Sequence, residues 1–578
     1  MMRILRHALH SLFLLLCHPL TIGLCSAAGV LLVRNAENGW LSVPFSLTVV
    51  AVISALAFLA SDRPAFSIYL GWMTVGVLTV VSATKYRLKG FSFHFYDTVF
   101  VAGDPEIYSF LFSSYLHVIL PVLVLLALIL AFAIGLYRAD SKANYALSTR
   151  SAVLAVFAAT VPLTFPAEAS VERQFYYMQG RHLSAFFVSL VDLRNLFVQP
   201  AFEARLEAMA PQAPFPDTVD CGDRTKLPDV FVVLSESQSD PAYFSQIDNG
   251  GRFAEKFAPG AGKPHPMTVE TFGGGTWITN LSLMTGLSST DFGWRSPYLT
   301  ITLEGRVGGA LPEVLGACGY RTAVLLPMNE TFVNEGPFLK SIGFETVLDI
   351  ADIAAPSYHL RDDFYYQAAE TFIAEHRRTD GRPLFLEIQT MFPHSPYNDR
   401  LEPQLKVDGE PFSPEFDISE YMRRMAIARG DFQAFLDERA AQSAEHASVV
   451  FEFGDHQSSA TKPLVDALAG DGALSDPGSL AYRTFYTLTT FNHPLAHPIP
   501  DAETLDIGFV GASLLDAAGL PMSPMMADLI ALRDLCHGAF HSCPDRQAID
   551  VHLRRRIDSG LLHLFPAAPP LHVAATGR

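Results

Sequence analysis

Positive charge is scarce in this sequence. Its 578 residues include 41 Lys and Arg against 59 Asp and Glu, which gives a formal net charge of -18 at pH 7. Because contact with nucleic-acid phosphates requires a basic surface, this balance excludes DNA or RNA as an expected partner. The sequence also has no internal repeat and no low-complexity tract.

Cysteine is rare as well, with six residues in the chain. Four of them lie beyond residue 170: Cys221, Cys318, Cys536 and Cys543. Cys536 and Cys543 are close enough in sequence for a disulfide that closes a short loop, which requires an oxidising compartment. A metal site in which these two cysteines act with His537 and His541 is the alternative. The sequence leaves both open, and it leaves open whether Cys221 pairs with Cys318.

Long apolar runs are concentrated in the first third of the chain. Five stretches approach the roughly 20 residues that a bilayer core requires, at 8–33, 41–60, 66–83, 115–137 and 151–165. Charged residues fall between these stretches, so we expect about five membrane-spanning helices. A cleaved signal peptide is the alternative for the first stretch, because small residues stand where cleavage would occur.

The distribution of Lys and Arg predicts the orientation of these spans. The residues that mark the cytoplasmic side are Arg3, Arg6, Arg138, Lys142 and Arg150. With five spans, the N-terminus is cytoplasmic and the residues beyond the last span lie outside. Lys85, Arg87 and Lys89 then fall on the outer side, against this rule. Either they bind anionic lipid head groups there, or the number of spans differs by one.

Proline marks the boundary between the apolar part and the rest of the chain. Residues 172–209 mix apolar and charged residues at helical spacing, and Pro211, Pro214 and Pro216 then break the pattern. We therefore predict a transmembrane domain at 1–168, linker helices at 169–226 and a soluble domain at 227–578. The aromatic segment 89–97 is expected to lie along the membrane surface.

Short apolar runs alternate with helical patterns in the soluble domain. Runs rich in Val, Ile, Leu and Phe predict strands at 230–234, 321–326, 384–388 and 449–453. Helical patterns lie between them, at 311–318, 364–376 and 420–438. This alternation predicts an α/β fold with a mainly parallel sheet that helices cover on both faces. In such sheets, ligands bind beyond the carboxyl ends of the strands.

Four residues stand where strands or a glycine-rich loop would deliver them to one edge of this sheet. Glu236 follows the first strand, Asp455 and His456 follow the last, and Thr276 follows three glycines and opens a predicted helix at 277–284. Each has an ordinary explanation alone, because Glu236 and Thr276 could cap helices and the other two could form a turn. Together, two carboxylates, an imidazole and a hydroxyl predict a hard-cation site with Thr276 as nucleophile.

Residues on neighbouring loops are candidates for contact with substrate. His394 lies in a proline-rich loop after the strand at 384–388, where it is suited to hold a substrate oxygen or to protonate a leaving alkoxide. A surface histidine in a turn is the alternative. His493, beside Pro494, is expected to reach the site from another loop. Trp277 and Asn329 complete the expected substrate-binding set.

Several segments, taken in order, resemble a known family. They are residues 234–237, 271–277, 282–287, 392–397 and 454–456. They resemble the sulfatase-like branch of the alkaline phosphatase superfamily, and within it the membrane-bound lipoteichoic acid synthase and phosphoglycerol transferase group. The resemblance extends to the five-span anchor and covers most of the chain. It implies a sulfatase-like α/β domain behind an N-terminal bundle of transmembrane helices.

The resemblance also implies a two-step reaction. Glu236, Thr276, Asp455 and His456 would match the family's ligands to one divalent cation, with Mn²⁺ as first choice and Zn²⁺ or Mg²⁺ as alternatives. Thr276 would attack the phosphorus of a phospholipid head group and release diacylglycerol. An acceptor hydroxyl would then take the group from the phosphothreonine, with His394 steadying the phosphoryl oxygens or the proton transfer. The anchor would hold the site beside its lipid donor.

The chain departs from the family pattern in three places. Lipoteichoic acid synthases have Phe-Trp-Asn-Arg where this chain has residues 332–335, so Glu335 replaces a cation facing phosphate and a polyglycerol-phosphate acceptor is disfavoured. The Asp-His-Gly-Glu of phosphoethanolamine transferases is Asp-His-Gln-Ser here, at 455–458. Sulfatases need a Cys/Ser-x-Pro-x-Arg frame to form formylglycine. Residues 276–280 lack that frame, so sulfate-ester hydrolysis is the least favoured chemistry.

These observations predict a multi-pass enzyme of the bacterial inner membrane with its catalytic domain in the periplasm. It would transfer a phosphoglycerol-type head group from a membrane phospholipid to an envelope glycan or lipid. Phosphoethanolamine transfer is the closest alternative, followed by hydrolysis of a phosphodiester with the same residues. A non-catalytic envelope protein that binds lipid or glycan is the alternative from a different class.

Overall fold

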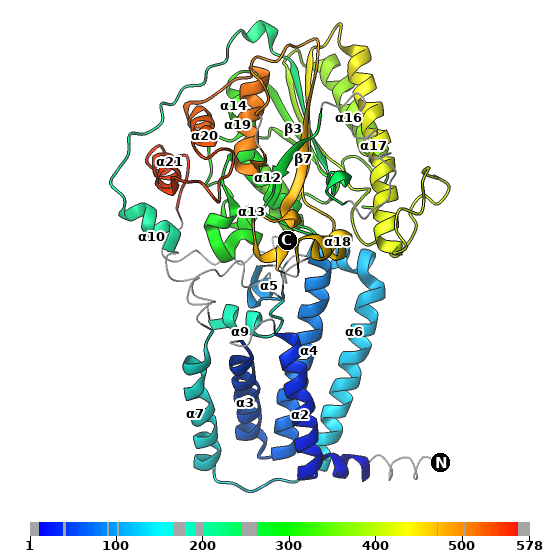
Figure 1. Ribbon diagram of the computed structural model, residues 1–578, viewed down its shortest axis with the longest axis vertical. Helices are drawn as coiled ribbons and strands as arrows, with labels where there is room; N and C mark the ends of the chain where they lie inside the picture. Colours follow the sequence, from blue (N-terminus) through cyan, green and yellow to red (C-terminus); the bar gives the residue numbers. More distant parts are fainter. Residues whose placement is uncertain are drawn as a thin grey trace, which may run out of the picture. The chain divides into compact units, whose positions relative to one another are not determined.

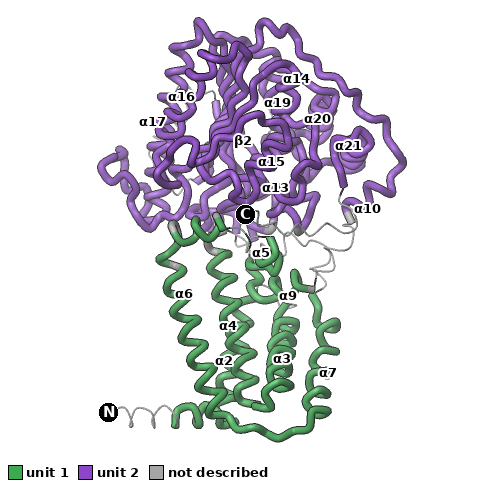
Figure 2. Tube along the Cα trace, turned by 180° about the vertical axis from the view of Figure 1, so that it is seen from behind, with its two compact units in different colours: residues 1–194 green, residues 195–578 purple. Residues whose placement is uncertain are grey.

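The computed structural model describes residues 11–37, 42–89, 92–100, 103, 105–166, 180–191, 201–244, 263–470, 472–500 and 503–564 (Figure 1). The chain divides into two compact units, residues 1–194 and 195–578 (Figure 2). This division falls inside the segment 169–226 that was predicted to link the two domains. The helices described in that segment are α9 (Ser184–Val191) and α10 (Ala201–Ala208). The predicted boundaries at 168 and 227 stay predictions.

Unit 1 contains the five predicted apolar helices. They are α2 (Pro19–Ala36), α3 (Ser42–Ser61), α4 (Pro64–Lys89), α6 (Pro105–Ala139) and α7 (Leu147–Thr164). Each is long and apolar enough to cross a membrane by length and composition. Residues 11–16 are also helical, but the helix is interrupted at 17–18 before α2 begins at Pro19, where the Nδ1 of His18 accepts a hydrogen bond from the N–H of Leu20. Residues 8–10 of the predicted first span lie outside the described residues.

The aromatic segment between the third and fourth spans packs inside unit 1. Its helix α5 (Phe95–Phe100) contacts α9, where the Ser189 hydroxyl accepts a hydrogen bond of 2.8 Å from the N–H of Phe95. Lys85, one of the basic residues that contradict the orientation rule, lies 2.6 Å from the Asp97 carboxylate. Its charge is therefore balanced within the unit, so binding to anionic lipid is not needed to explain it.

Unit 2 is built on one eight-stranded sheet with the strand order β4-β3-β5-β1-β6-β7-β2-β8. The strands are β1 (Asp229–Ser235), β2 (His265–Thr268), β3 (Arg321–Leu325), β4 (Thr346–Leu348), β5 (Leu384–Gln389), β6 (Ser448–Gly454), β7 (Arg483–Phe491) and β8 (Leu505–Asp506). The five strands from β4 to β6 run parallel, which confirms the prediction of a mainly parallel sheet. β7 runs antiparallel to β6, and β2 runs antiparallel to β7.

Helices cover both faces of this sheet, as predicted. In Figure 1, α12 (Thr276–Thr285), α14 (Leu311–Ala317) and α19 (Ile507–Ala518) lie on one face, and α16 (Asp362–Thr379) and α17 (Phe416–Gln442) lie on the other. The central strand β1 explains why its sequence is continuously apolar. Val230, Val232 and Leu234 belong to the core cluster that includes α12 and α19, while the ring of Phe231 lies 5.8 Å from that of Phe435 on α17.

Shorter helices and two disulfides complete unit 2. The helices are α13 (Leu299–Thr302), α15 (Glu335–Ser341), α18 (Lys462–Ala469), α20 (Pro524–Leu535) and α21 (Arg546–Asp558). Cys221 pairs with Cys318, which joins the segment before β1 to the end of α14. Cys536 pairs with Cys543 across the loop after α20. The alternative in which these last two cysteines bind a metal with neighbouring histidines is therefore wrong.

Candidate metal centre and nucleophile

Three of the predicted ligands meet at the carboxyl ends of the two central strands. Glu236 directly follows β1, and Asp455 and His456 follow β6, its neighbour in the sheet. All three side chains are buried, and one ligand atom from each lies within 4.8 Å of the others. Because β1 and β6 are parallel and in register, residues more than two hundred positions apart reach one point.

The backbone around these residues is packed very closely. A Cβ added at Gly454 would lie 2.0 Å from the carbonyl oxygen of Gln238, so only glycine fits under this loop. Ser237, the residue before Gln238, takes the left-handed conformation, with a φ of 55°. Its N–H donates a hydrogen bond of 2.7 Å to the Oδ1 of Asp455. The turn after β1 is therefore fixed against the turn after β6.

Thr276 reaches the same point from a glycine turn. Gly273, Gly274 and Gly275 all have positive φ, with Gly275 as the N-cap of α12, so the alternative in which Thr276 caps the helix is wrong. The Thr276 hydroxyl donates a hydrogen bond of 3.0 Å to the Oε2 of Glu236, and its oxygen lies 3.5 Å from the Nε2 of His456. The predicted nucleophile and the three predicted ligands are thus brought together.

The nucleophile loop is also tied to the segment that carries Asp455 and His456. The N–H of Gly273 donates to the carbonyl of Gln457 at 2.9 Å, and the hydroxyl of Thr279, one turn into α12, donates to the carbonyl of Asp455 at 2.7 Å. The Gln457 side chain is itself buried and donates to the carbonyls of Leu480 and Arg483. Gln457, the glutamine that departs from the family pattern, therefore has a structural role in joining this segment to the carbonyls of Leu480 and Arg483.

The site holds two carboxyl groups away from water. Burial raises the pKa of Glu236 to about 8, with a further increase from Asp455, while His456 and two hydroxyl hydrogen bonds oppose it. Burial also raises the pKa of Asp455 to about 6. Because burial disfavours the ionised forms of both carboxyl groups, a cation bound between them would stabilise those forms.

Hydrogen bonding around His456 supports a cation between these groups. The Nδ1 of His456 lies 3.0 Å from the carbonyl of Gln457, which assigns the ring proton to Nδ1. The Nε2 of His456 lies 3.2 Å from the Oδ2 of Asp455 and 3.7 Å from the Oε1 of Glu236. An imidazole nitrogen and two carboxylate oxygens gathered at these distances are a ligand set that fits one shared divalent cation.

His394 lies beside this centre, after β5. Its Nε2 is 4.0 Å from the Oε1 of Glu236, and its Nδ1 contacts the carbonyl of Ser395. Arg424 on α17 donates a hydrogen bond of 3.0 Å to the carbonyl of His394. The side chain is buried, which excludes the alternative of a surface histidine in a turn.

Two groups near the site were missed by the sequence analysis. The ring of His359 lies 6.2 Å from that of His394, and burial, with help from Arg424, lowers its pKa to about 4. The Tyr421 hydroxyl donates a hydrogen bond of 2.8 Å to the carbonyl of Ser237, beside Glu236. His359 precedes a helix without a strand end or a glycine turn, and Tyr421 lies within a helix, so neither carried a recognisable signal.

Two of the predicted substrate-binding residues lie at the same edge of the sheet as the metal centre. The indole N–H of Trp277 donates to the carbonyl of Pro297 at 3.1 Å, which leaves the ring beside Phe332. Asn329 follows β3, and its side chain accepts hydrogen bonds from Thr331. Their contacts fix local turns, and their proposed contact with substrate stays a prediction.

The structure does not bring His493 to this site. Because β7 is antiparallel to β6, Phe491 at its end pairs with Ser448 at the start of β6. His493 therefore lies at the opposite edge of the sheet, where its Nε2 is 2.7 Å from the carbonyl of Ala518.

Glu335, the residue that replaces the expected arginine, lies in a buried polar cluster. The amide of Gln389 donates hydrogen bonds to Glu335 at 3.0 Å and to Glu387 at 2.9 Å. Burial raises the pKa of Glu335, and it raises that of Glu387 to about 8. Glu335 is therefore hydrogen-bonded to a buried amide and forms part of the protein interior.

Comparison with known proteins agrees with this fold. Residues 228–476 match the sulfatase family model. An uncharacterised protein of Haemophilus influenzae is 23% identical over 343 residues, which is 56% of this chain and 59% of the relative, so the match spans about three fifths of the relative's length.

Two solved structures are similar to this chain. The integral membrane protein lipooligosaccharide phosphoethanolamine transferase A of Neisseria meningitidis has a TM-score of 0.50 at 13% identity, covering 85% of this chain and 95% of its own. The phosphoglycerol transferase GacH of Streptococcus pyogenes has a TM-score of 0.46 at 18% identity, covering 60% and 89%. At such identities the first likeness is one of fold, and it includes the apolar helices.

Proposed function

We propose, from the premise that residues 228–476 form a sulfatase-family domain, that this chain is a membrane-anchored, metal-dependent phosphotransferase. The observation that carries the proposal is the position of Thr276. Its hydroxyl is hydrogen-bonded to Glu236 within a buried cluster of two carboxylates and an imidazole, and it begins helix α12. A hydroxyl held there has a proton acceptor, a cation site and free helix N–H groups beside it.

The first step is attack of the Thr276 oxygen on the phosphorus of a phospholipid head group. The bond from this oxygen to phosphorus forms, and the bond from phosphorus to the diacylglycerol oxygen breaks. The Thr276 proton leaves along its hydrogen bond to Glu236. His394, whose Nε2 faces Glu236, donates a proton to the departing diacylglycerol oxygen. The product is a phosphothreonine that carries the head group.

The second step reverses this chemistry with a different alcohol. His394 takes the proton of an acceptor hydroxyl, whose oxygen attacks the phosphorus. The bond to Thr276 breaks, and the Thr276 oxygen recovers its proton from Glu236. The free N–H groups at the start of α12 stabilise the negative oxygens in both steps.

Glu236, Asp455 and His456, with Thr276 as a fourth ligand, would hold one divalent cation. Bound there, a cation neutralises phosphoryl oxygens and lowers the pKa of the Thr276 hydroxyl. The mixed carboxylate and imidazole ligands suit Mn²⁺, our first choice, and also Zn²⁺ or Mg²⁺.

For the donor we keep a phosphoglycerol head group as the first candidate and phosphoethanolamine as the second. The second candidate is the head group named for the phosphoethanolamine transferase whose fold is similar over 85% of the chain. The acceptor would be an envelope glycan or lipid. Two disulfides in unit 2 are consistent with an oxidising compartment such as the periplasm, on the outer face of the bacterial inner membrane.

The reaction is tested with full-length protein in lipid vesicles that contain phosphatidylglycerol or phosphatidylethanolamine labelled in the head group. With Mn²⁺ present, the wild type should release diacylglycerol and carry the label on Thr276. Thr276→Ala should do neither, and the lipid that labels the protein identifies the donor. Equal release of diacylglycerol by wild type and Thr276→Ala would exclude the covalent mechanism.

Two further measurements separate the alternatives. A phosphodiester hydrolase would release the free head-group phosphate at the same rate with or without an added acceptor alcohol, whereas a transferase would form a new ester. A non-catalytic binding protein would release no diacylglycerol from either lipid.

A further inference from the structure

Another buried carboxylate, that of Glu270, is bonded to the nucleophile helix away from the metal centre. Glu270 lies between β2 and the glycine turn and is 6% exposed. Its carboxylate accepts hydrogen bonds from the Ser282 hydroxyl on α12 at 3.3 Å and from the N–H of Ser289, beyond the helix, at 2.7 Å. It therefore joins the segment before Thr276 to the helix that Thr276 begins and to the loop that follows.

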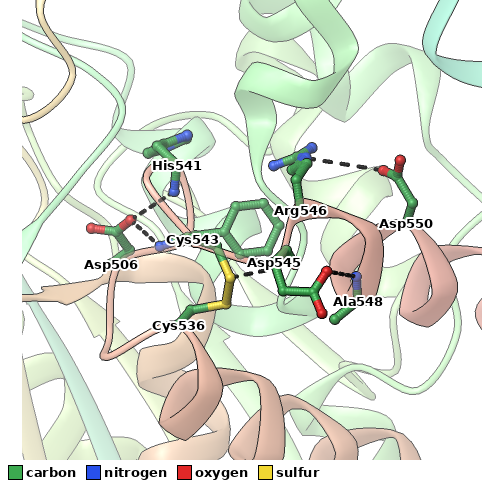
Figure 3. The surroundings of a disulfide bond; sticks show 9 residues. Asp506, Cys536, His541, Cys543, Asp545, Arg546, Ala548 and Asp550 are labelled. Atoms are coloured by element: carbon green, nitrogen blue, oxygen red, sulfur yellow. Dashed lines mark hydrogen bonds and ion pairs between the residues drawn. A yellow bond between two sulfur atoms is a disulfide. The ribbon is translucent and has the colours of Figure 1, made fainter.

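The positive partner of this carboxylate comes from the C-terminal part of the unit. The Nε2 of His541 lies 3.2 Å from the Oε1 of Glu270, and its Nδ1 lies 3.3 Å from the Thr290 hydroxyl. Asp506 also faces His541 and accepts a hydrogen bond from its backbone N–H (Figure 3). Both ring nitrogens therefore have acceptors in reach, as a charged imidazole requires.

The surrounding charges favour the imidazolium. Burial opposes a charged ring, but Glu270, Asp506 and Asp291 together raise the pKa of His541. Burial would raise the pKa of Glu270, but His541 and two serines hold it below its ordinary value. Arg546, the other cation nearby, contacts Asp291.

A disulfide fixes the loop that presents His541. The bond between Cys536 and Cys543 closes this loop, and Figure 3 shows His541 and the disulfide in the same loop beside Asp506. The loop is docked on β8, because the N–H of Asp506 donates to the carbonyl of Gly538 at 2.8 Å and the N–H of Phe540 donates to Asp506 at 2.6 Å. Closing the loop limits the positions that His541 reaches.

We propose that the disulfide-closed loop 536–543 positions the nucleophile, with His541 as the positioning residue that acts through Glu270. Helix α12 is held by two side chains one turn apart: Thr279 donates to the carbonyl of Asp455, and Ser282 donates to Glu270. Without His541, the buried charge of Glu270 loses its cation, and the helix loses this second attachment. The inference rests on the proposed function for its effect on catalysis.

We call Glu270, His541 and the disulfide-closed loop 536–543 the latch. Removing it should lower kcat and leave KM for the lipid donor unchanged, because none of the contacts described for these residues is to Thr276 or to a predicted metal ligand. We expect a loss of about tenfold to a hundredfold in kcat for His541→Ala and for the pair Cys536→Ser and Cys543→Ser, the range for a misplaced reacting group. The matched control is the other disulfide, removed by Cys221→Ser and Cys318→Ser, which should leave kcat unchanged. Equal losses for the two disulfides would overturn the proposal.

The pH profile separates positioning from general stability. In the wild type, kcat should fall as pH rises through the raised pKa of His541, because the neutral ring no longer balances Glu270. His541→Gln keeps a donor for Glu270 without a titrating ring, so it should retain more activity than His541→Ala and lose this decline. A His541→Ala enzyme with wild-type kcat and wild-type pH profile would overturn the proposal.

Hydrogen exchange tests the latch without any reaction. The amides of residues 279–285 should exchange faster in His541→Ala and in the Cys536/Cys543 variant than in wild type or in the Cys221/Cys318 variant. Unchanged exchange in the first two would exclude the latch. If the wild type released no diacylglycerol while exchange responded as expected, the transfer reaction would be wrong and the latch would stand. If His541→Ala did not fold, His541→Gln would supply the same comparison with intermediate exchange.

Discussion

Tyr421, in the second turn of α17, donates a hydrogen bond of 2.8 Å to the carbonyl oxygen of Ser237, next to the predicted metal ligand Glu236. Its ring lies 5.7 Å from that of Tyr397. The Tyr397 hydroxyl in turn donates to the carbonyl of Pro393, beside His394, and contacts the Ser458 hydroxyl at 2.6 Å. Two buried tyrosines therefore join the loops that follow β1, β5 and β6.

Tyr421→Phe should weaken metal binding, because it frees the strained turn at Ser237 while leaving the packing of the ring intact. Loss of one buried hydrogen bond costs about 1 kcal/mol, and the carbonyl left behind costs about 1–3 kcal/mol. We expect Mn²⁺ affinity, measured by calorimetry, to fall about tenfold, in the range seen for groups that orient ligands.

The control for this variant is Tyr320→Phe. Tyr320 is also buried, and its hydroxyl donates a hydrogen bond of 2.9 Å to the backbone carbonyl of Pro228. This carbonyl lies at the other end of β1 from Ser237. The Tyr320→Phe substitution should therefore lower the melting temperature without changing Mn²⁺ affinity. Equal effects of the two substitutions on affinity would show that the tyrosine hydroxyls act on stability alone.

Gly454→Ala should disrupt the site more than its small size suggests. The added methyl group would meet the Gln238 carbonyl at 2.0 Å, so the turn that carries Ser237 has to move away from Asp455. We expect loss of metal binding and a lower melting temperature. Gly381→Ala is the matched control, because no atom lies within 4 Å of a Cβ at that position. Normal metal binding by Gly454→Ala would contradict the close approach of the Gln238 carbonyl to Gly454.

Removal of the metal should destabilise the wild type and leave Asp455→Asn unaffected. A cation that binds only the folded state stabilises it by about 2.7 kcal/mol at a hundred times its dissociation constant. We therefore expect a chelator to lower the melting temperature of the wild type, and added Mn²⁺ to restore it. A chelator effect of the same size in Asp455→Asn would place the metal elsewhere.

Glu387→Gln should stabilise the protein at alkaline pH. The pKa of Glu387 is raised from 4.5 to about 8 by burial, so the folded state holds a proton that the unfolded state has lost. Stability contributed in this way is present at low pH and is lost as pH rises through about 8. The variant keeps a neutral side chain throughout.

The melting temperature of Glu387→Gln, relative to wild type, should therefore increase between pH 5 and pH 8. Glu375→Gln is the control for replacing a glutamate at the surface, because the Glu375 side chain is 57% exposed. A constant difference for Glu387→Gln would show that Glu387 is ionised in the folded protein.

The central strands could be predicted from the sequence because both of their faces are buried. Val230 to Leu234 has no polar residue to suggest a solvent face, and its length is that of a strand. The same reasoning located β3, β5 and β6, and with them the residues that follow. Since parallel strands share one carboxyl edge, the meeting of Glu236 with Asp455 followed from the pattern alone.

The failure at His493 has a specific physical cause. The strand before it, β7, is antiparallel to β6, and a strand's direction depends on its partner rather than on its own residues. The same limit applies to His541 and Glu270, which meet through β8, a strand of two residues. Contacts that depend on such short or reversed strands leave no periodic signal in the sequence.

The order of the strands along the chain also delays the chemistry during synthesis. Glu236 and Thr276 are made early, but Asp455 lies 218 residues beyond Ser237. At about 5–20 residues per second, translation needs roughly ten to forty-five seconds to cover that distance. During this interval β1 lacks its neighbour β6, and Thr276 lacks the cation site that would activate it. The candidate site is therefore incomplete until nearly four fifths of the chain has been translated.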